Sequence, residues 1–324
     1  MRITLNKICV SLFFTSLLAI VASPQIRDTP PSWAYVVNPP DFKAPNDNGT
    51  VRHVPGSTAG WTLTQLQDFF FAADWHPEDH PRMPRVVARG RKPDVFACGF
   101  CHRADGSGGP ENARLTGLPK AYIMQQMADF KNGLRKGSES LRLPTARMAA
   151  VAEATTDKEV ASVAAYFSNL KPRKTITVME TDLVPKTYVA GWFLAPVNDR
   201  DKEPIGNRIV EMPKNVEQFE SRDTHSEFIA YAPIGSIARG EALAKTGGAG
   251  KTTPCGKCHG PDLRGLGAIP GIAGRSPSYL MRQLYDFQHR TRSGAGSALM
   301  TGVVAHLNEE DMVSLSAYAA SLNP

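Results

Sequence analysis

Two short motifs with the same chemistry occur in this sequence, one over 98–102 and one over 255–259, and both read Cys-Gly-x-Cys-His. The pattern Cys-x-x-Cys-His is the attachment signature of a c-type haem. Two thiols on one helical turn can form thioethers with the vinyl groups of a porphyrin, and the histidine that follows supplies its nitrogen to the iron. Two complete motifs therefore predict two covalent haem c groups. The residues expected to hold them are Cys98, Cys101 and His102 in the first motif and Cys255, Cys258 and His259 in the second.

Two other kinds of site also use paired cysteines. A redox-active disulfide uses Cys-x-x-Cys, but it is typical of a βαβ context and needs no histidine after the second cysteine. A zinc site built from both cysteine pairs is compatible with the thiols. It leaves His102 and His259 without a role, so haem attachment is favoured.

Each iron also needs a ligand on its second face, or that face stays open for chemistry. Met148 and Met300 follow His102 and His259 at similar separations, each just before the last predicted helix of its segment. A thioether is a soft ligand that suits iron and raises its reduction potential. We therefore expect Met148 and Met300 to lie on loops and to bind the irons; the alternative is that they fill the core.

The surroundings of the two motifs repeat at a nearly constant offset, which indicates an internal duplication. The motif histidines are 157 residues apart (259 − 102), and the segment around Tyr279 matches the segment around Tyr122 at the same offset. The two methionines are 152 residues apart (300 − 148), so the second copy is shorter between these points. The repeat predicts two domains of one fold, at 86–171 and 235–324.

Helical periodicity supplies the elements that would position these residues. In the first copy, apolar residues recur at helical spacing over 120–134 and again over 156–170. A short amphipathic helix is also expected over 61–74, with Ser57 or Thr58 as its cap. The expected fold class is mostly α-helical, with two tandem copies.

Two segments fall outside the repeat. Residues 24–85 are rich in Pro, Asn, Asp and Gly, and they indicate an extended arm in which Trp33 and Tyr35 pack on the first domain. Residues 172–234 are long for a bare linker and contain stretches of strand-like composition. We expect them to form an ordered strap, with a small hairpin, that links the two domains.

Several histidines lie outside the motifs. His76 and His80 stand beside acidic residues in a proline-bounded turn, where a solvated loop is favoured over a metal site or an iron ligand. His225 and His306 are candidates for acid–base chemistry by residue type alone. No nucleophile or acid–base set accompanies them.

Residues 1–23 have the pattern of a secretory signal, with Arg2 and Lys7 before an apolar run and small residues at its end. A membrane anchor is the alternative, although the run is shorter than a spanning helix needs. Cys9 lies inside this segment, so all four remaining cysteines belong to the haem motifs. Loss of the segment leaves 35 basic residues, from 37, against 31 acidic ones. This mild excess favours an acidic redox partner over nucleic acid, since no basic stripe interleaved with aromatics occurs.

These features resemble the di-haem cytochrome c4 family. The resemblance rests on the two haem motifs, the helix with Tyr122 and Gln126, the Asp-Phe pair ending at Phe130, the later methionine, and a last helix with Ala-Tyr166. It covers the two predicted domains. It implies two mainly helical cytochrome c domains with His/Met iron, related by a pseudo-twofold axis, that pass electrons in the periplasm.

The resemblance also raises two questions about the haem surroundings. The family's proline, whose carbonyl orients the iron-bound histidine, is present as Pro270 but is replaced by Ala113 in the first copy, so we expect different surroundings for the first histidine. Arg135 and Arg292 match at the offset of 157 and are candidates for pairing with haem propionates. The alternative is two solvated arginines near helix ends.

The sequence therefore predicts a periplasmic di-haem c-type cytochrome that transfers electrons between redox proteins and is not itself an enzyme. One alternative is the electron-accepting subunit of a periplasmic dehydrogenase. A di-haem redox enzyme such as a peroxidase is the other, and it would need an exchangeable iron ligand.

Overall fold

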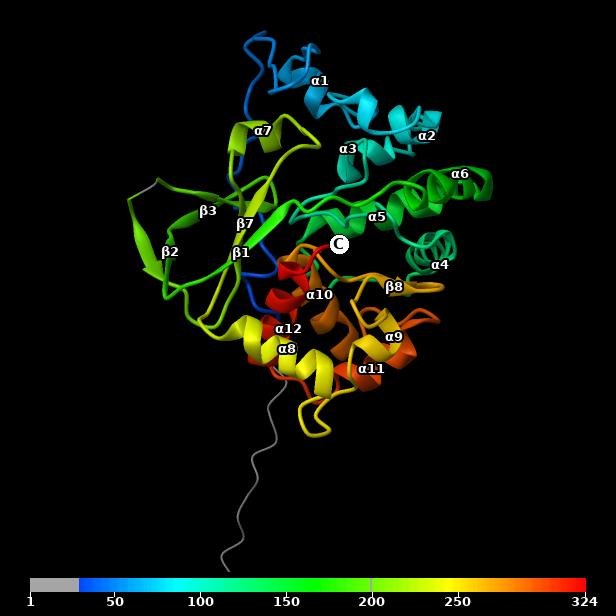
Figure 1. Ribbon diagram of the computed structural model, residues 1–324. Coiled ribbons are helices and arrows are strands. Elements are labelled where there is room, and N and C mark those ends of the chain that lie inside the picture. The colour runs from blue at the N-terminus through cyan, green and yellow to red at the C-terminus, as the bar shows by residue number, and fades with distance from the viewer. Residues whose placement is uncertain (1–28, 199) are drawn as a thin grey trace, which may run out of the picture.

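The structure is a computed structural model that describes residues 29–198 and 200–324; the predicted leader, with Cys9, lies outside the described residues. Helices dominate, as predicted, and most strands lie together to one side of two groups of helices (Figure 1). No helix in the described ranges combines the length and the apolar character needed to cross a membrane.

The first group of helices contains the first haem motif. Its helices are α2 (Arg85–Ala88), α3 (Cys98–His102), α4 (Lys120–Lys131), α5 (Leu143–Ala154) and α6 (Asp157–Ser168). A capping box fixes the start of α6, because the Thr156 hydroxyl accepts from the Glu159 amide while the Glu159 carboxylate accepts from the Thr156 amide. Helices α5 and α6 both pack on α4, and residues of these three helices line a cavity that α3 also lines.

The second group contains the second motif. Its helices are α8 (Ser236–Thr246), α9 (Gly256–His259), α10 (Pro277–Gln288), α11 (Ser297–Val304) and α12 (Glu309–Ser321), with a small hairpin of β8 (Gly265–Leu266) and β9 (Ile269–Pro270). Helices α4 and α10 begin 157 residues apart (277 − 120), and α6 and α12 begin 152 apart (309 − 157). The elements thus follow the two offsets in the sequence.

The strap is an ordered β-structure. Its central sheet has the order β1-β7-β6, in which β1 is parallel to β7 and β6 is antiparallel to β7. Two further strand pairs, β2 with β5 and β3 with β4, and a short helix complete it. The elements are β1 (Ile176–Glu180), β2 (Leu183–Pro185), β3 (Thr187–Ala190), β4 (Phe193–Pro196), β5 (Lys202–Pro204), β6 (Val210–Pro213), α7 (Val216–Glu220) and β7 (Phe228–Ala232).

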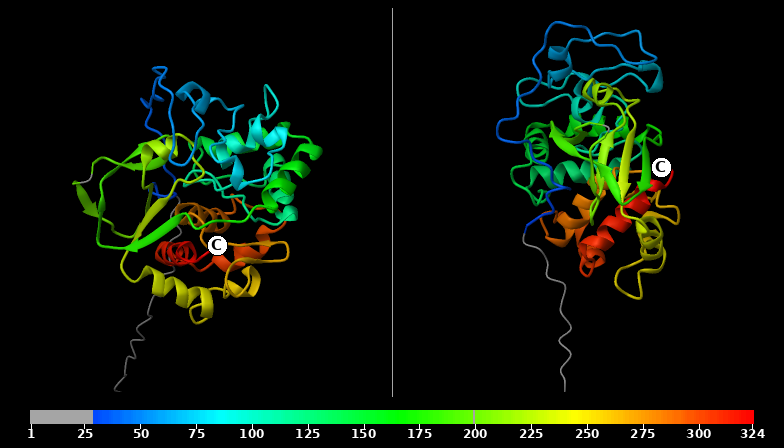
Figure 2. Two further views of the ribbon diagram at one scale, coloured as in Figure 1. Left: turned by 45° about the horizontal axis from the view of Figure 1, so that its top comes forward. Right: turned by 90° about the vertical axis from the view of Figure 1, so that its left-hand side faces the viewer.

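The strap joins the second group of helices through one apolar core. Helix α12 packs on β1 and β7, and strap residues such as Phe228 share a buried cluster with Met312 and Tyr318. Figure 2 shows the sheet lying alongside both groups of helices. The strap is therefore a packed part of the molecule and not a tether.

The arm begins on the second group of helices and ends over the first. The Tyr35 hydroxyl, buried at 3% exposure, donates to Asp286 on α10 at 2.7 Å, and the Trp33 indole donates to Glu309 on α12 at 3.1 Å. Both polar contacts are thus made with the second group of helices and not, as predicted, with the first domain, although Tyr35 also lines the cavity beside the first motif. A tyrosine and an indole can be anchored wherever their polar atoms find a partner, and here the partners are two acids of the second copy.

The remainder of the arm has little regular structure. Helix α1 (Leu63–Gln67) is much shorter than predicted, and its cap is Thr62 in a capping box with Gln65, not Ser57 or Thr58. A 3₁₀ turn, η1 (Pro77–Asp79), follows. In Figure 1 this part of the arm lies with α2 and α3 at the top of the molecule, close to α7.

Candidate haem sites

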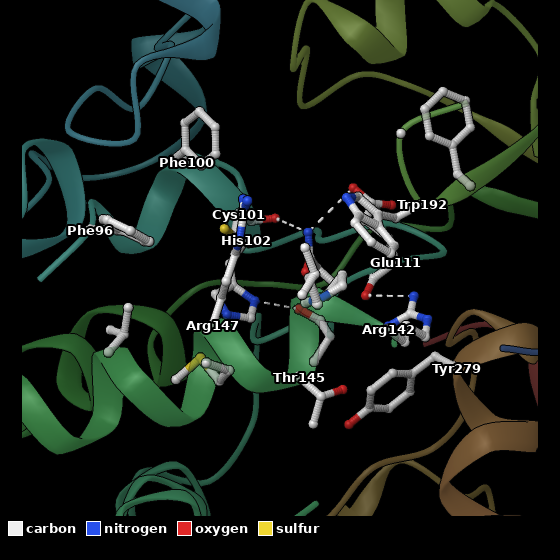
Figure 3. A pocket seen from close by; sticks show the side chains of 18 of the residues that line it. Phe96, Phe100, Cys101, His102, Glu111, Arg142, Thr145, Arg147, Trp192 and Tyr279 are labelled. Carbon is white, nitrogen blue, oxygen red and sulfur yellow. Dashed lines mark hydrogen bonds between the residues drawn. The ribbon is translucent and has the colours of Figure 1, made fainter. Parts of the chain in front are cut away.

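The first haem motif opens on a cavity of about 1120 Å³, slightly larger than most ligand sites. Cys98, Cys101 and His102 line one side of it, and Met148 lines it from α5. Apolar residues from α4 and α6, among them Ile123, Met127, Phe130 and Val163, contribute much of the lining. The close-up in Figure 3 shows His102 and Cys101 turned into this space.

The motif histidines are oriented by backbone carbonyls in the same way in both copies. His102 Nδ1 lies 2.8 Å from the Ala113 carbonyl oxygen, and His259 Nδ1 lies 2.7 Å from that of Pro270. The Nδ1–H donates to the carbonyl, which leaves Nε2 with its lone pair free for iron. Burial lowers the pKa of both imidazoles and so favours the neutral, ligating form.

This geometry corrects the expectation of different surroundings for the first histidine. The contact is made by a main-chain oxygen, which alanine offers as well as proline does. Ala113 thus takes the position of Pro270, and the side chain at this site does not decide the hydrogen bond.

The four motif cysteines carry free thiols. Burial raises the pKa of Cys98 to about 12 and that of Cys255 to about 11, so both thiols are held in the protonated form. Together with an imidazole that has a free Nε2 and an apolar cavity that contains a thioether, these donors fit a covalently attached haem. Each motif thus supplies two thiols for the thioether bonds and one histidine nitrogen for the iron of a c-type haem.

The two candidate methionine ligands do not lie on loops, as the sequence analysis expected. Met148 lies within α5 and Met300 within α11. Pro144 does not prevent the helix that contains Met148, because it lies in the first turn of α5, where a proline needs no amide hydrogen and favours the helix start. Both methionines are half-buried, and Met300 also packs against the core of the second copy.

Arg135 and Arg292 meet where the two copies touch. Arg135 Nη2 donates to the Tyr279 hydroxyl of α10 at 2.9 Å, and Arg292 Nη2 donates to the Tyr122 hydroxyl of α4 at 2.7 Å. The offset of 157 relates Arg135 to Arg292 and Tyr122 to Tyr279, so exchanging the two copies converts one contact into the other. They are therefore related by approximate twofold symmetry, and the arginines are not simply solvated.

Two glutamine side chains close these contacts into a ring. Gln126 Oε1 accepts from Arg135 at 2.9 Å and from Arg292 at 2.8 Å, and Gln283 Oε1 accepts from the same two arginines at 3.1 and 2.9 Å. A backbone bridge pairs Arg135 with Arg292 in an antiparallel sense. We call Tyr122, Gln126, Arg135, Tyr279, Gln283 and Arg292 the interface ring.

The interface ring holds two positive charges without a carboxylate hydrogen bond to either arginine in the described part of the chain. Arg292 Nε is buried and has no hydrogen-bond partner. Burial by itself raises the pKa of the Tyr122 phenol, but the charges of Arg292 and Arg135 outweigh burial and lower it. A partner for an anionic group is thus available beside the first cavity, which Arg135 also lines.

Two histidines outside the motifs, His76 and His80, pack the arm against the strap and the first group of helices. His76 is not in a solvated loop: it is 2% exposed, its Nε2 lies 3.0 Å from Asp223 of the strap, and its ring stacks on His225 at 3.6 Å. His80 contacts Asp74 and the Tyr166 hydroxyl. Of all described histidines, His102 is the one that lines the first cavity.

The strap covers the first motif with residues that were not predicted from the sequence. Arg222 donates through Nη1 to the Phe100 carbonyl oxygen at 2.8 Å, with its guanidinium 3.6 Å from the centre of the Phe100 ring. Arg103 packs its guanidinium on Phe219 of α7 at 4.6 Å. No signal in the sequence pointed to this contact, since the strap has no counterpart in the repeat.

Comparison with known proteins connects these sites to one family. A family model described as cytochrome c matches residues 87–171. Cytochrome c-554(548) of Halomonas halodenitrificans is 36% identical over 83 residues, which are 25% of this chain and 96% of that protein.

Two other relatives match over a longer stretch of this chain. Cytochrome c4 of Pseudomonas aeruginosa is 25% identical over 70% of this chain and 84% of its own length. A thiosulfate dehydrogenase electron acceptor of Thiomonas intermedia is 24% identical over 71% of this chain and 80% of its own length. Among solved structures, reduced recombinant cytochrome c4 from Pseudomonas stutzeri aligns over 70% of this chain and 93% of its own, with 22% identity and a TM-score of 0.44.

Proposed function

This chain belongs to the cytochrome c family as a di-haem, cytochrome c4-like protein, and from this premise we propose which of its residues hold and connect the two haems. It carries two covalent haem c groups and transfers electrons between redox proteins. Each haem supplies an iron that alternates between the ferric and ferrous states. The protein's part is to hold, orient and shield these groups.

We propose one set of ligands for each haem. Cys98 and Cys101 form the thioethers of haem 1, and His102 and Met148 bind its iron. Haem 2 uses the residues at the equivalent positions, namely Cys255, Cys258, His259 and Met300. The support is the carbonyl contact at each histidine Nδ1 and the position of Met148 in the wall of the first cavity.

Two cytochrome c domains, 86–171 and 235–324, form the proposed framework, joined by the strap 172–234 and by the arm 24–85. The observation that carries the proposal of a linked pair is the interface ring, in which each copy donates an arginine to the other copy's tyrosine. Arg135 and Arg292 would hold haem propionates at this boundary, because their charges lack carboxylate hydrogen bonds among the described residues. A ring of this kind keeps the two haems at a fixed separation.

Replacement of single methionines tests the ligands. Met148→His and Met300→His should each lower the reduction potential of one haem and leave the other unchanged, because imidazole stabilises ferric iron more than a thioether does. Spectroelectrochemistry of the full-length holoprotein measures both potentials. If neither substitution alters the spectrum or a potential, the irons have other ligands, and the alternative of a redox enzyme is strengthened.

Pulse reduction tests the linked pair. After one electron enters, the two haems should equilibrate at a rate that does not depend on protein concentration, since both belong to one chain. A rate that rises in proportion to concentration would mean that transfer occurs between molecules, and the proposed link would be wrong.

The proposed location is the periplasm, supported by the leader-like residues 1–23. The proposed partners are redox proteins, one as donor and one as acceptor. Relatives named thiosulfate dehydrogenase electron acceptors favour a second candidate, in which the donor is a periplasmic dehydrogenase that this chain serves as a dedicated acceptor. Co-purification separates the two candidates. A dedicated acceptor should co-purify with such a dehydrogenase, whereas a general carrier should not.

A further inference from the structure

Three arginines surround the thioether edge of the first site. They are Arg103, Arg147 and Arg222, and one acid, Glu111, lies among them. All four side chains line the same cavity as Cys101. Figure 3 shows Arg147 and Glu111 on the walls of this space, together with Cys101 and His102.

Arg222 is held firmly by the arm and the first motif. Its Nε donates to the Leu66 carbonyl oxygen at 2.7 Å, and its Nη1 donates to that of Phe100 at 2.8 Å. Both acceptors are neutral carbonyls, so the guanidinium keeps its full charge beside the motif. Burial lowers the pKa of Arg222 to about 10, which still leaves the group protonated at neutral pH.

Arg103 adds a second buried charge directly after the ligand His102. It is 3% exposed, and its Nη2 donates to the Phe219 carbonyl oxygen at 3.1 Å. Its Nη1 is buried without a hydrogen-bond partner. Arg147 is exposed and adjoins Met148, with its guanidinium 4.7 Å from the centre of the Phe69 ring.

The second site has none of these charges. By the offsets of 157 and 152, Gly260 is equivalent to Arg103 and Leu299 is equivalent to Arg147. Arg222 has no equivalent, because the strap is not repeated in the sequence. At the position of Phe100, which is 4% exposed, the second copy has an exposed Lys257. The first motif is therefore buried at Phe100 and has three arginines in the cavity beside it, whereas the second motif has an exposed lysine at the position of Phe100.

We infer that Arg103, Arg147 and Arg222 raise the reduction potential of haem 1 above that of haem 2, so that domain 1 is the end of the pair on which an electron comes to rest. A ferric haem carries one more positive charge than a ferrous haem, so nearby cations favour the ferrous state, and the buried Arg103 does so more strongly than the exposed Arg147, which water screens. Exclusion of water from the first edge acts in the same direction. The inference rests on the proposed function, since it needs two haems in one chain.

The test compares two substitutions of the same arginine in the full-length holoprotein. Arg222→Gln removes the positive charge and keeps a hydrogen-bond donor. Arg222→Lys keeps the positive charge but loses the planar guanidinium group. Arg208→Gln is the matched control: it is a strap arginine that pairs with Glu203 and does not line the cavity. Spectroelectrochemical titration resolves the two midpoint potentials of each variant.

Arg222→Gln should lower the higher midpoint and leave the lower one in place, and Arg222→Lys should lower it less. Arg208→Gln should match the wild type. Arg147→Gln, at an exposed position, repeats the test without a risk to folding and should shift the same component downward.

Two results would overturn the inference. One is a shift confined to the lower midpoint, which would make haem 1 the weaker acceptor. The other is a higher midpoint that does not move in either glutamine variant. In the wild type, equal midpoints for the two haems would also contradict the inference. Uptake of only one electron per chain would instead count against the proposed function, so the two failures are distinguishable.

Discussion

Tyr122→Phe and Tyr279→Phe would each remove one hydroxyl from the interface ring and leave the rings in place. Each hydroxyl accepts a hydrogen bond from an arginine of the other copy, at 2.7 and 2.9 Å. A hydrogen bond to a charged group contributes about 1.5–3 kcal/mol. Each guanidinium retains both glutamine acceptors, so we expect a loss near the lower limit, about 1.5 kcal/mol for each substitution.

The double variant provides the sharper measurement. Gln126 and Gln283 each accept from both arginines, so after one substitution they can compensate the arginine that has lost its partner. After two substitutions they cannot compensate both. We therefore expect the double variant to lose more than the sum of the single ones, by about 0.5 kcal/mol or more.

Urea unfolding of the holoprotein, followed by circular dichroism, measures these losses. Tyr188→Phe is the control, since Tyr188 is 51% exposed and outside the interface ring. Strict additivity of the two single losses would show that the two halves of the ring act independently. Single variants as stable as the wild type would refute the view that the ring holds the copies together.

Two further predictions concern packing and pH. Gly240→Ala should destabilise the protein by several kcal/mol, because a methyl group there would overlap the Ser314 carbonyl oxygen where α8 crosses α12; thermal unfolding measures it, and an unchanged midpoint would contradict the close approach. Burial lowers the pKa of His80, but hydrogen bonds to Asp74 and to the Pro81 carbonyl outweigh burial and raise it above 6.5. The stability that this pair contributes is therefore complete below pH 6.5 and is lost as the pH rises through the raised pKa of His80. The difference in unfolding free energy between the wild type and His80→Gln should thus shrink from about pH 5.5 to about pH 8.5. An equal difference at both pH values would contradict the ion pair.

The repeated parts of the fold were predictable because their signals are local. The haem motifs, the helix that begins at Lys120 and the helix capped by Thr156 each follow from residue type and spacing, and the structure contains these elements. The offset between the copies then located the matching elements of the second copy.

The errors arose where long-range contacts decide the structure. His76 has the sequence surroundings of a surface loop, but Asp223 of the strap pairs with it and makes burial possible. Trp33 and Tyr35 found their acceptors on helices more than two hundred residues away. Periodicity within a segment carries no information about such partners.

A duplication by itself gives two equivalent sites, so any difference between the two haems must come from residues that the repeat does not share. The structure contains two sources of difference. Within the copies, the first has Phe100 and Arg103 where the second has Lys257 and Gly260. Outside them, the arm and the strap close over the first motif through Arg222, while the second motif keeps an exposed residue at its centre. By this inference, the direction in which an electron moves along the pair depends both on residues that differ between the two domains and on the arm and the strap, which the repeat does not contain.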